Sequence, residues 1–191
     1  LYKGTPIAVA MRIPWSNDDG YLLMHARKGN GSWVDGSRVN VRPPSESGVP
    51  VAGAHAAAPR WIRRAFNILK PLQGNLGELR DGGSACYEQF MVARGSMQYA
   101  ITGVAFTWDF AAGTLLTKEA GGKVMVLGPD RRFKEFNGWS DGYANDSATY
   151  GRIRKWKGLI LSGAPATVDF VAANLEPKKF GFLSKLKSMF S

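Results

Sequence analysis

The stretch TWDFAAGTLLTKEAGG, Thr107 to Gly122, places one carboxylate, that of Asp109, at the head of an unusually apolar run. The run predicts a helix that begins at Asp109 and ends before Gly121 and Gly122, because glycine commonly terminates helices. A helix that is apolar on most sides is usually buried, so this one is expected in the interior. Asp is among the best N-cap residues. The stretch alone leaves open whether Asp109 caps the helix or holds something charged.

The composition predicts a soluble, cytoplasmic globular protein. The chain has 191 residues, of which 45% are hydrophobic and 12% aromatic, so it can bury a sizeable core. Its single cysteine, Cys86, excludes an internal disulfide and favours a reducing compartment. No apolar run approaches the roughly 20 residues of a membrane span, and the first residues lack a signal-peptide pattern. No integral membrane segment is therefore expected.

The net charge is +10, from 25 Lys and Arg against 15 Asp and Glu, which favours an anionic partner. The basic residues gather in four runs, at 60–66, 128–136, 151–158 and 178–190. Such runs are commonly solvated surface. A nucleic-acid-binding module would rest on charge alone, since no motif interleaves aromatic and basic residues. We therefore predict no nucleic-acid partner.

The N-terminal part predicts antiparallel sheet. PIAVAMRI (6–13) and YLLMHAR (21–27) are apolar and flank PWSNDDG, which is dense in turn formers, so the two runs are expected to form a hairpin. The run at 32–41 contains the turn Asp35-Gly36 and indicates further pairing. RPPSESGVP (42–50), with three prolines and two serines, is typical of a linker.

Two helices are expected between the linker and the Asp109 stretch. Apolar residues recur at helical spacing from 60 to 70, where Pro71 provides a stop. The segment GGSACYEQFMVARG (82–95) predicts a helix that Ser84 can cap and that Gly95 can end.

Beyond the Asp109 helix, two strands, a loop and a helix are expected. KVMVL (123–127) and KGLILSG (157–163) indicate strands, and ATVDFVAANL (166–175) indicates a final helix. The segment at 138–151 is polar and rich in turn formers, so it predicts a loop.

Three segments resemble the inositol monophosphatase-like phosphatases. WDFAAGTLLTKEAGG resembles their C-terminal signature, W-D-x-A-A-G followed by E-A-G-G. GGSACYEQFMVARG resembles their G-S-A-A segment with its helix, and KGNGSWVDGSRVNV (28–41) is similar to their K-G-x-G-A-x-x-N-G segment. The order and rough spacing of the three segments fit, and the resemblance covers residues 4 to about 175.

The resemblance implies a layered α/β sandwich of the inositol monophosphatase/fructose-1,6-bisphosphatase type, with its N-terminal part missing. The family's other metal-binding carboxylates, an upstream Glu and a D-P-x-D-G-T segment, do not occur in these 191 residues. The expected organisation is the end of an antiparallel-sheet domain plus linker (1–50), a C-terminal α/β domain (51–175) and a basic tail (176–191). We expect a fragment that is inactive alone.

The activity implied by the resemblance is Mg²⁺-dependent hydrolysis of a small phosphate monoester by metal-activated water. Asp109 is implied as a metal ligand, and Gly83, Ser84 and Ala85 as the turn that contacts the substrate. Thr102 is implied as a further substrate-binding residue. It stands where inositol phosphatases carry a Glu, which leaves sugar, inositol, nucleotide and histidinol phosphates open. Glu119, in the E-A-G-G segment, is expected to be structural.

Two further expectations concern partners. A homodimer is implied by the resemblance alone. The alternative function is a non-catalytic relative that binds a phosphorylated ligand or a protein partner. In the tail, apolar residues share a possible helical face among lysines, which predicts either a frayed basic terminus or a segment that lies on a membrane surface or docks on a partner.

Overall fold

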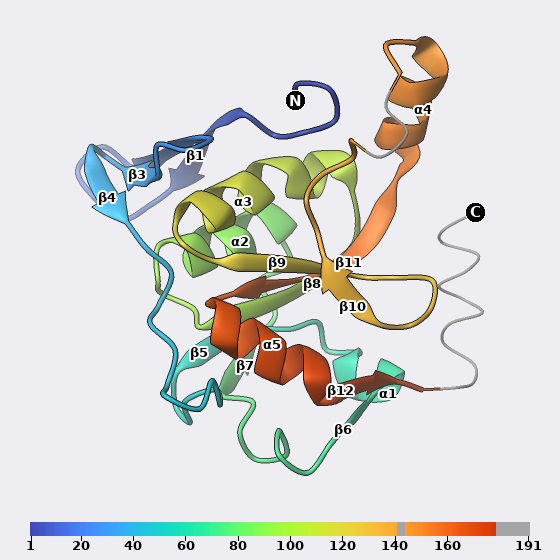
Figure 1. Cartoon of the computed structure of the whole chain (residues 1–191). Coiled ribbons are helices and arrows are strands. Elements are labelled where there is room, and N and C mark those ends of the chain that lie inside the picture. Colours follow the sequence, from blue (N-terminus) through green and yellow to red (C-terminus); the bar gives the residue numbers. More distant parts are fainter. Residues whose placement is uncertain (141–143, 179–191) are drawn as a thin grey trace.

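Two sheets enclose a pair of helices, and a further helix packs on the outer face of the larger sheet (Figure 1). The computed structural model describes residues 1–140 and 144–178. The elements in chain order are β1 (Ala8–Pro14), β2 (Tyr21–Arg27), β3 (Ser32–Val34), β4 (Ser37–Val39), β5 (His55–Ala57), α1 (Ile62–Ala65), β6 (Phe66–Ile68), β7 (Glu78–Arg80), α2 (Ala85–Ala93), β8 (Tyr99–Phe106), α3 (Thr107–Glu119), β9 (Lys123–Leu127), β10 (Phe133–Glu135), α4 (Ser147–Lys155), β11 (Lys157–Gly163), α5 (Pro165–Ala173) and β12 (Leu175–Pro177).

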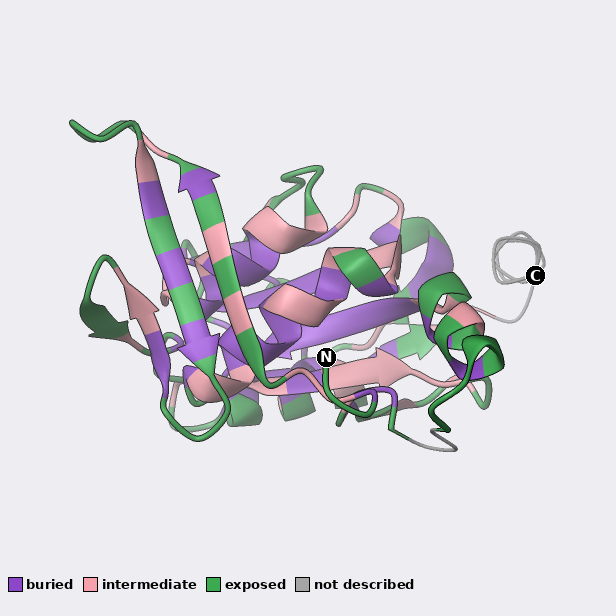
Figure 2. Ribbon diagram, turned by 90° about the horizontal axis from the view of Figure 1, so that it is seen from above, coloured by how far each residue is buried: buried purple, intermediate pink, exposed green. Residues whose placement is uncertain are grey.

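The first sheet has the order β1-β2-β3-β4, and every neighbouring pair is antiparallel. Met11 lies opposite Met24, and burial alternates along both strands of the hairpin (Figure 2). Asp35 and Gly36, between β3 and β4, both have positive φ, of 46° and 78°. Such a pair matches the twist of a tight hairpin turn. The predicted hairpin and the further antiparallel pairing are confirmed.

Helices α2 and α3 lie between the two sheets. Phe90 of α2 and Leu116 of α3 share one apolar cluster with Met24 of the first sheet. On its other side, α3 places Phe110 against Ile160 of the second sheet. Because α3 is covered from both sides, its body is apolar almost all round. The prediction that this helix is buried is confirmed.

The second sheet has the order β10-β9-β11-β8-β5-β7. β11 pairs antiparallel with both β8 and β9, and β5 pairs parallel with β7 and β8. Helix α5 packs on the face away from α3 through Val168 and Val171, which are fully buried. The predicted strands at 123–127 and 157–163 and the predicted final helix are thereby confirmed.

The helix predicted at 60–70 is wrong. Helix α1 has only four residues, and the chain turns extended at Phe66, whose φ and ψ are −125° and 146°. Residues 66–68 form β6, which pairs antiparallel with β12. Strand pairing with a distant segment thus overrides the local helical spacing. The helix is also weakened at its start, because no side chain caps it at Trp61.

The predicted loop at 138–151 is wrong in its second half, because α4 begins at Ser147. Asp146 caps this helix, and its side chain accepts a hydrogen bond from the Thr149 N–H at 2.7 Å. The basic tail lies outside the described residues from 179 onward. Among the residues that are described, none of the helices is both long enough and apolar enough to cross a membrane.

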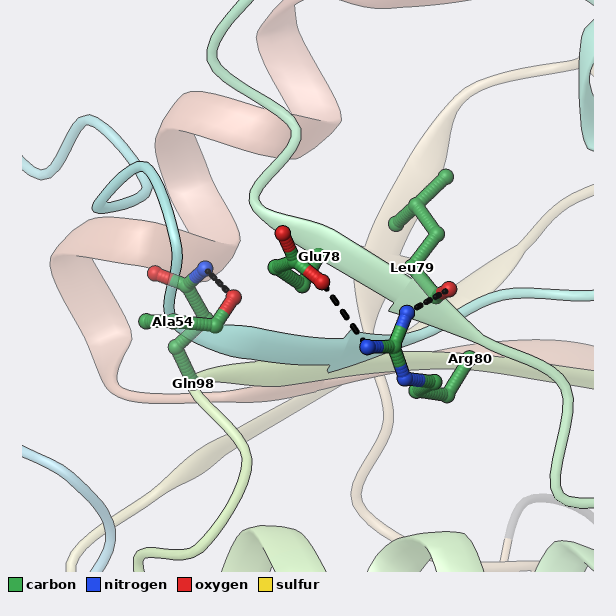
Figure 3. A network of polar contacts seen from close by, with 5 residues as sticks. All are labelled: Ala54, Glu78, Leu79, Arg80 and Gln98. Atoms are coloured by element: carbon green, nitrogen blue, oxygen red, sulfur yellow. Dashed lines mark hydrogen bonds and ion pairs between the residues drawn. The ribbon is translucent and has the colours of Figure 1, made fainter.

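Gln98 fixes the loop that leads into β5 (Figure 3). Its Oε1 accepts from the Val51 N–H at 2.7 Å, and its Nε2 donates to the carbonyl oxygens of Val51 and Ala54 at 3.2 and 3.1 Å. On β7, Arg80 and Glu78 form an exposed ion pair at 2.8 Å. The loop is therefore held by a buried amide, whereas the ion pair contributes little.

Candidate functional site at the first turns of α2 and α3

Asp109 lies in the first turn of α3 but is not its N-cap. The helix begins at Thr107 with Phe106 as N-cap, and the Asp109 Oδ2 accepts a hydrogen bond from the Phe106 N–H at 2.9 Å. Thr107 is fixed by α4, because its N–H donates to the Trp156 carbonyl at 3.2 Å and its hydroxyl donates to the Ile153 carbonyl. These contacts start the helix two residues earlier than predicted. The half-buried Asp109 still satisfies a backbone donor at the helix start.

Helix α2 begins as predicted at an exposed turn. Ser84 is its N-cap, and the Ser84 Oγ accepts from the Tyr87 N–H at 3.4 Å. Gly83 has a φ of +66°, which favours glycine, and a Cβ at this position would meet nothing within 4 Å. Ala85 is the first helical residue. The backbone of this turn is thus open to solvent, where a ligand can approach it.

The first turns of the two helices touch. The Cys86 Sγ of α2 donates to the Asp109 carbonyl oxygen at 3.2 Å. Ala85 packs against the same apolar cluster as Ala111 of α3. Burial raises the pKa of the Cys86 thiol, and the negative charge of Asp109 raises it further. Burial, with the charge of Asp109 as the smaller cause, thus favours the protonated thiol over the reactive thiolate.

Thr102 is linked to the same turn through Glu88, a residue that the sequence analysis did not single out. Thr102 is 2% exposed and donates from its hydroxyl to the Glu88 Oε2 at 3.3 Å. The Glu88 Oε1 accepts from the Gly82 N–H at 3.1 Å. Glu88 is buried on α2 and therefore supports the turn ahead of Ser84 from below. The alternation of polar and apolar residues in α2 gives no signal for this role.

These residues make a place where two helix N-termini converge beside one carboxylate. Unpaired N–H groups and the partial positive charge of a helix N-terminus favour anions. A carboxylate such as Asp109 is a suitable ligand for a hard divalent cation. Within residues 1–140 and 144–178, however, no group of three or more His, Cys, Asp or Glu side chains could hold a metal ion. The described residues thus fit one ligand of a metal ion and not a complete set.

Glu119, at the end of α3, joins two of the sequence motifs. Its Oε1 and Oε2 accept hydrogen bonds from the N–H groups of Gly29 and Gly31, both at 2.9 Å. Both glycines have a φ of 80°. The carboxylate therefore fixes the turn between β2 and β3, as expected of a structural residue.

Two cavities lie away from this place, beside β6 and β12. Their volumes are about 480 and 860 Å³. The smaller is lined by Arg63 and Lys178 among others, and the larger by Arg131 and Asp169 among others. Neither is lined by Asp109 or by the first turn of α2. Their location separates them from the motif residues, so they are not part of the candidate site.

Comparison with known proteins gives a consistent result. The model of the Inositol monophosphatase family matches residues 1–161. The fructose-1,6-bisphosphatase/inositol-1-monophosphatase of Aquifex aeolicus is 32% identical over 132 residues, which are 67% of this chain and 48% of that protein. The Nus factor SuhB of Escherichia coli strain K12 is 26% identical over 175 residues, or 91% of this chain and 56% of that protein. The chain spans about half the length of these relatives.

Solved structures share the fold. Inositol monophosphatase-II of Staphylococcus aureus MSSA476 matches with a TM-score of 0.63 and 19% identity, over 97% of this chain and 60% of that one. SaIMPase-II has been solved with 2'AMP bound and with inositol monophosphate bound, and these match with TM-scores of 0.60 and 0.58 at 18% and 20% identity. The match to the 2'AMP-bound structure covers 90% of this chain and 56% of the SaIMPase-II chain. The match to the inositol monophosphate-bound structure covers 88% of this chain and 57% of the SaIMPase-II chain. The fold is therefore the layered α/β fold that the sequence predicts.

Proposed function

Because the chain belongs to the inositol monophosphatase family, we propose that it is the Asp109-bearing part of a magnesium-dependent phosphomonoesterase. The relative from Aquifex aeolicus is named as a phosphatase. The observation that carries the proposal is the contact between the first turns of α2 and α3, through Cys86 and Asp109. It brings a carboxylate, open backbone and two helix N-termini together.

In this proposal Asp109 is one ligand of Mg²⁺. The ion prefers oxygen ligands, and as a Lewis acid it would supply charge stabilisation to the phosphoryl group. Since the described residues contain no complete ligand set, the remaining carboxylates come from outside them. Asp109 itself is positioned for this role by the Phe106 N–H, which holds one carboxylate oxygen and orients the other.

The substrate is a small phosphate monoester, and the turn of Gly83, Ser84 and Ala85 contacts its hydroxyl groups. The exposed turn has space for a ligand, because nothing lies near the missing Cβ of Gly83. SaIMPase-II holds inositol monophosphate in one structure and 2'AMP in another, so both chemical classes remain candidates here. Thr102 acts indirectly, since its buried hydroxyl is already bound to Glu88.

An alternative is a non-catalytic relative that binds a phosphorylated ligand or a protein partner. It is favoured by the incomplete ligand set, because a single carboxylate does not assemble a multi-metal site. A cytoplasmic location and a homodimer remain part of the proposal for either function.

The experiment that separates the two is phosphate release from a panel of sugar, inositol, nucleotide and histidinol phosphates. The protein expressed from its natural gene is assayed with Mg²⁺, without Mg²⁺ and with added Li⁺. The enzyme hypothesis predicts release that requires Mg²⁺ and is inhibited by Li⁺. Binding of these esters without any release would establish the alternative instead.

A further inference from the structure

Trp108, the residue directly before Asp109, is unusually open to solvent. Its side chain is 55% exposed, although large aromatic side chains are mostly buried. Its indole stacks on the ring of Phe106, with centroids 4.4 Å apart and planes 12° from parallel. A stacked pair covers one face of the indole, and the exposed fraction leaves surface for a further flat group.

This stack is fixed relative to Asp109. The Phe106 N–H donates to the Asp109 carboxylate at 2.9 Å, so one residue supports both the carboxylate and the indole. Phe106 is itself held in β8, opposite Lys157 of β11. The Lys157 Nζ lies 4.7 Å from the centroid of the Phe106 ring. An aromatic surface held in this way loses little conformational freedom when a ligand binds.

The surroundings of the stack favour an anionic ligand. The last turn of α4 is basic, with Arg152, Arg154 and Lys155. It meets the start of α3 through the hydrogen bond from Thr107 to the Ile153 carbonyl. The positive charge of Lys157 on the Phe106 ring, together with that of the α4 turn, favours a phosphate-bearing ligand and raises its local concentration.

Recognition of a polyol by Thr102 and Glu88 is not favoured. The Thr102 hydroxyl is buried and donates to Glu88, and both Glu88 oxygens already accept hydrogen bonds. Neither side chain is free to bind a ring of hydroxyl groups. Trp108, directly before Asp109, is in contrast an exposed aromatic residue.

We propose that Trp108 is a stacking platform for the base of a nucleoside monophosphate whose phosphate binds beside Asp109. The inference rests on the proposed function for the location of the phosphate and adds the substrate class. Stacking of a base on an aromatic side chain is strong enough to change affinity by about tenfold or more. Trp108 is therefore a specificity-determining residue that leaves the phosphoryl chemistry to other groups.

The test compares AMP with ribose 5-phosphate, which has the same sugar and phosphate but no base. Equilibrium binding and phosphate release are measured for the parent protein and for Trp108→Ala, Trp108→Phe and Tyr2→Ala. Tyr2 is an aromatic control that is 59% exposed and is not one of the residues described for the site. We expect Trp108→Ala to weaken AMP binding and kcat/KM for AMP about tenfold. Ribose 5-phosphate is expected to be unaffected, Trp108→Phe to retain most AMP binding, and Tyr2→Ala to match the parent.

The outcomes separate this inference from the proposed function. If Trp108→Ala weakens AMP and ribose 5-phosphate equally, or changes neither, the platform is rejected even when both esters are hydrolysed. If neither ester is hydrolysed but AMP binds about tenfold less well to Trp108→Ala, the platform stands and the enzyme hypothesis fails for these esters. Tighter binding of ribose 5-phosphate than of AMP by the parent protein also rejects the platform.

Discussion

The Glu119 Oε2 lies 2.9 Å from the backbone nitrogen of Gly31, across the boundary between α3 and the first sheet. The other carboxylate oxygen binds the Gly29 N–H at the same distance. One side chain thereby ties the E-A-G-G segment to the K-G-x-G turn. Both glycines need positive φ to present their N–H groups in this way.

Glu119→Gln should destabilise the protein, because the amide keeps one acceptor and turns its NH₂ group toward a backbone donor. We expect a loss of about 1–3 kcal/mol in the free energy of unfolding, measured by urea denaturation. Glu46→Gln, at an exposed position in the linker, is the control and should change stability by less than about 0.5 kcal/mol. Equal stability of Glu119→Gln and the parent would show that the two N–H groups do not depend on this carboxylate.

Glu88 should make stability depend on pH. Burial raises its pKa from the ordinary value of 4.5, while the hydrogen bonds from Gly82 and Thr102 lower it and the charge of Asp81 raises it. A carboxyl with a raised pKa holds its proton longer in the folded than in the unfolded state, so stability falls as pH rises from 4.5 through the folded pKa. Denaturation midpoints between pH 4 and 7 measure this slope.

Glu88→Gln supplies the comparison for that slope. The amide can accept from Gly82 and donate to Thr102, and it does not titrate. We expect the variant to lose less stability than the parent as pH rises over the same range. A steeper loss in the variant would mean that the charged form of Glu88 is favoured by folding.

Gly113→Ala should weaken the contact between α2 and α3. A Cβ at Gly113 would lie 1.8 Å from the Gln89 Oε1 and 2.5 Å from the Gln89 Cβ, so the buried Gln89 would have to shift. We expect a loss of about 1–3 kcal/mol by thermal or urea denaturation. Gly151→Ala in α4, where nothing lies within 4 Å, should instead stabilise by up to about 1 kcal/mol. The same sign for both variants would contradict the close packing.

Sequence patterns predicted the parts of the fold that have local causes. The hairpin of β1 and β2 follows from two apolar runs around a turn, and α2 follows from the Ser84 cap and the Gly95 stop. The apolar body of α3 predicted burial between layers. The division of the chain at 50 and 175 remains a prediction.

Several elements that depend on distant partners were not predicted. Strand β8 was not assigned, although it lies between β11 and β5 in the second sheet. β5 and β7 have three residues each, too short to show a period. β6 forms where a helix was predicted, because its pairing partner β12 lies more than a hundred residues further along the chain.

The site was predicted in part, and its residue roles remain proposals. The resemblance indicated Asp109 and the turn at Gly83 to Ala85, and the structure connects these segments through Cys86. It could not indicate Glu88, because a buried carboxylate on a helix looks like any other polar residue until Thr102 and Gly82 are placed beside it. Asp109 accepts a hydrogen bond from a backbone N–H at the helix start without being the N-cap. That it holds something charged remains a prediction.

The most direct test of the central claim is Mg²⁺-dependent phosphate release by Asp109→Asn in the protein expressed from its natural gene. If Asp109 is a metal ligand, the variant should be at least about 100-fold slower than the parent at saturating Mg²⁺. Asp130→Asn, which alters an exposed ion pair with Lys134, should match the parent. Release by Asp109→Asn at the parental rate, with the parental Mg²⁺ dependence, would contradict the account.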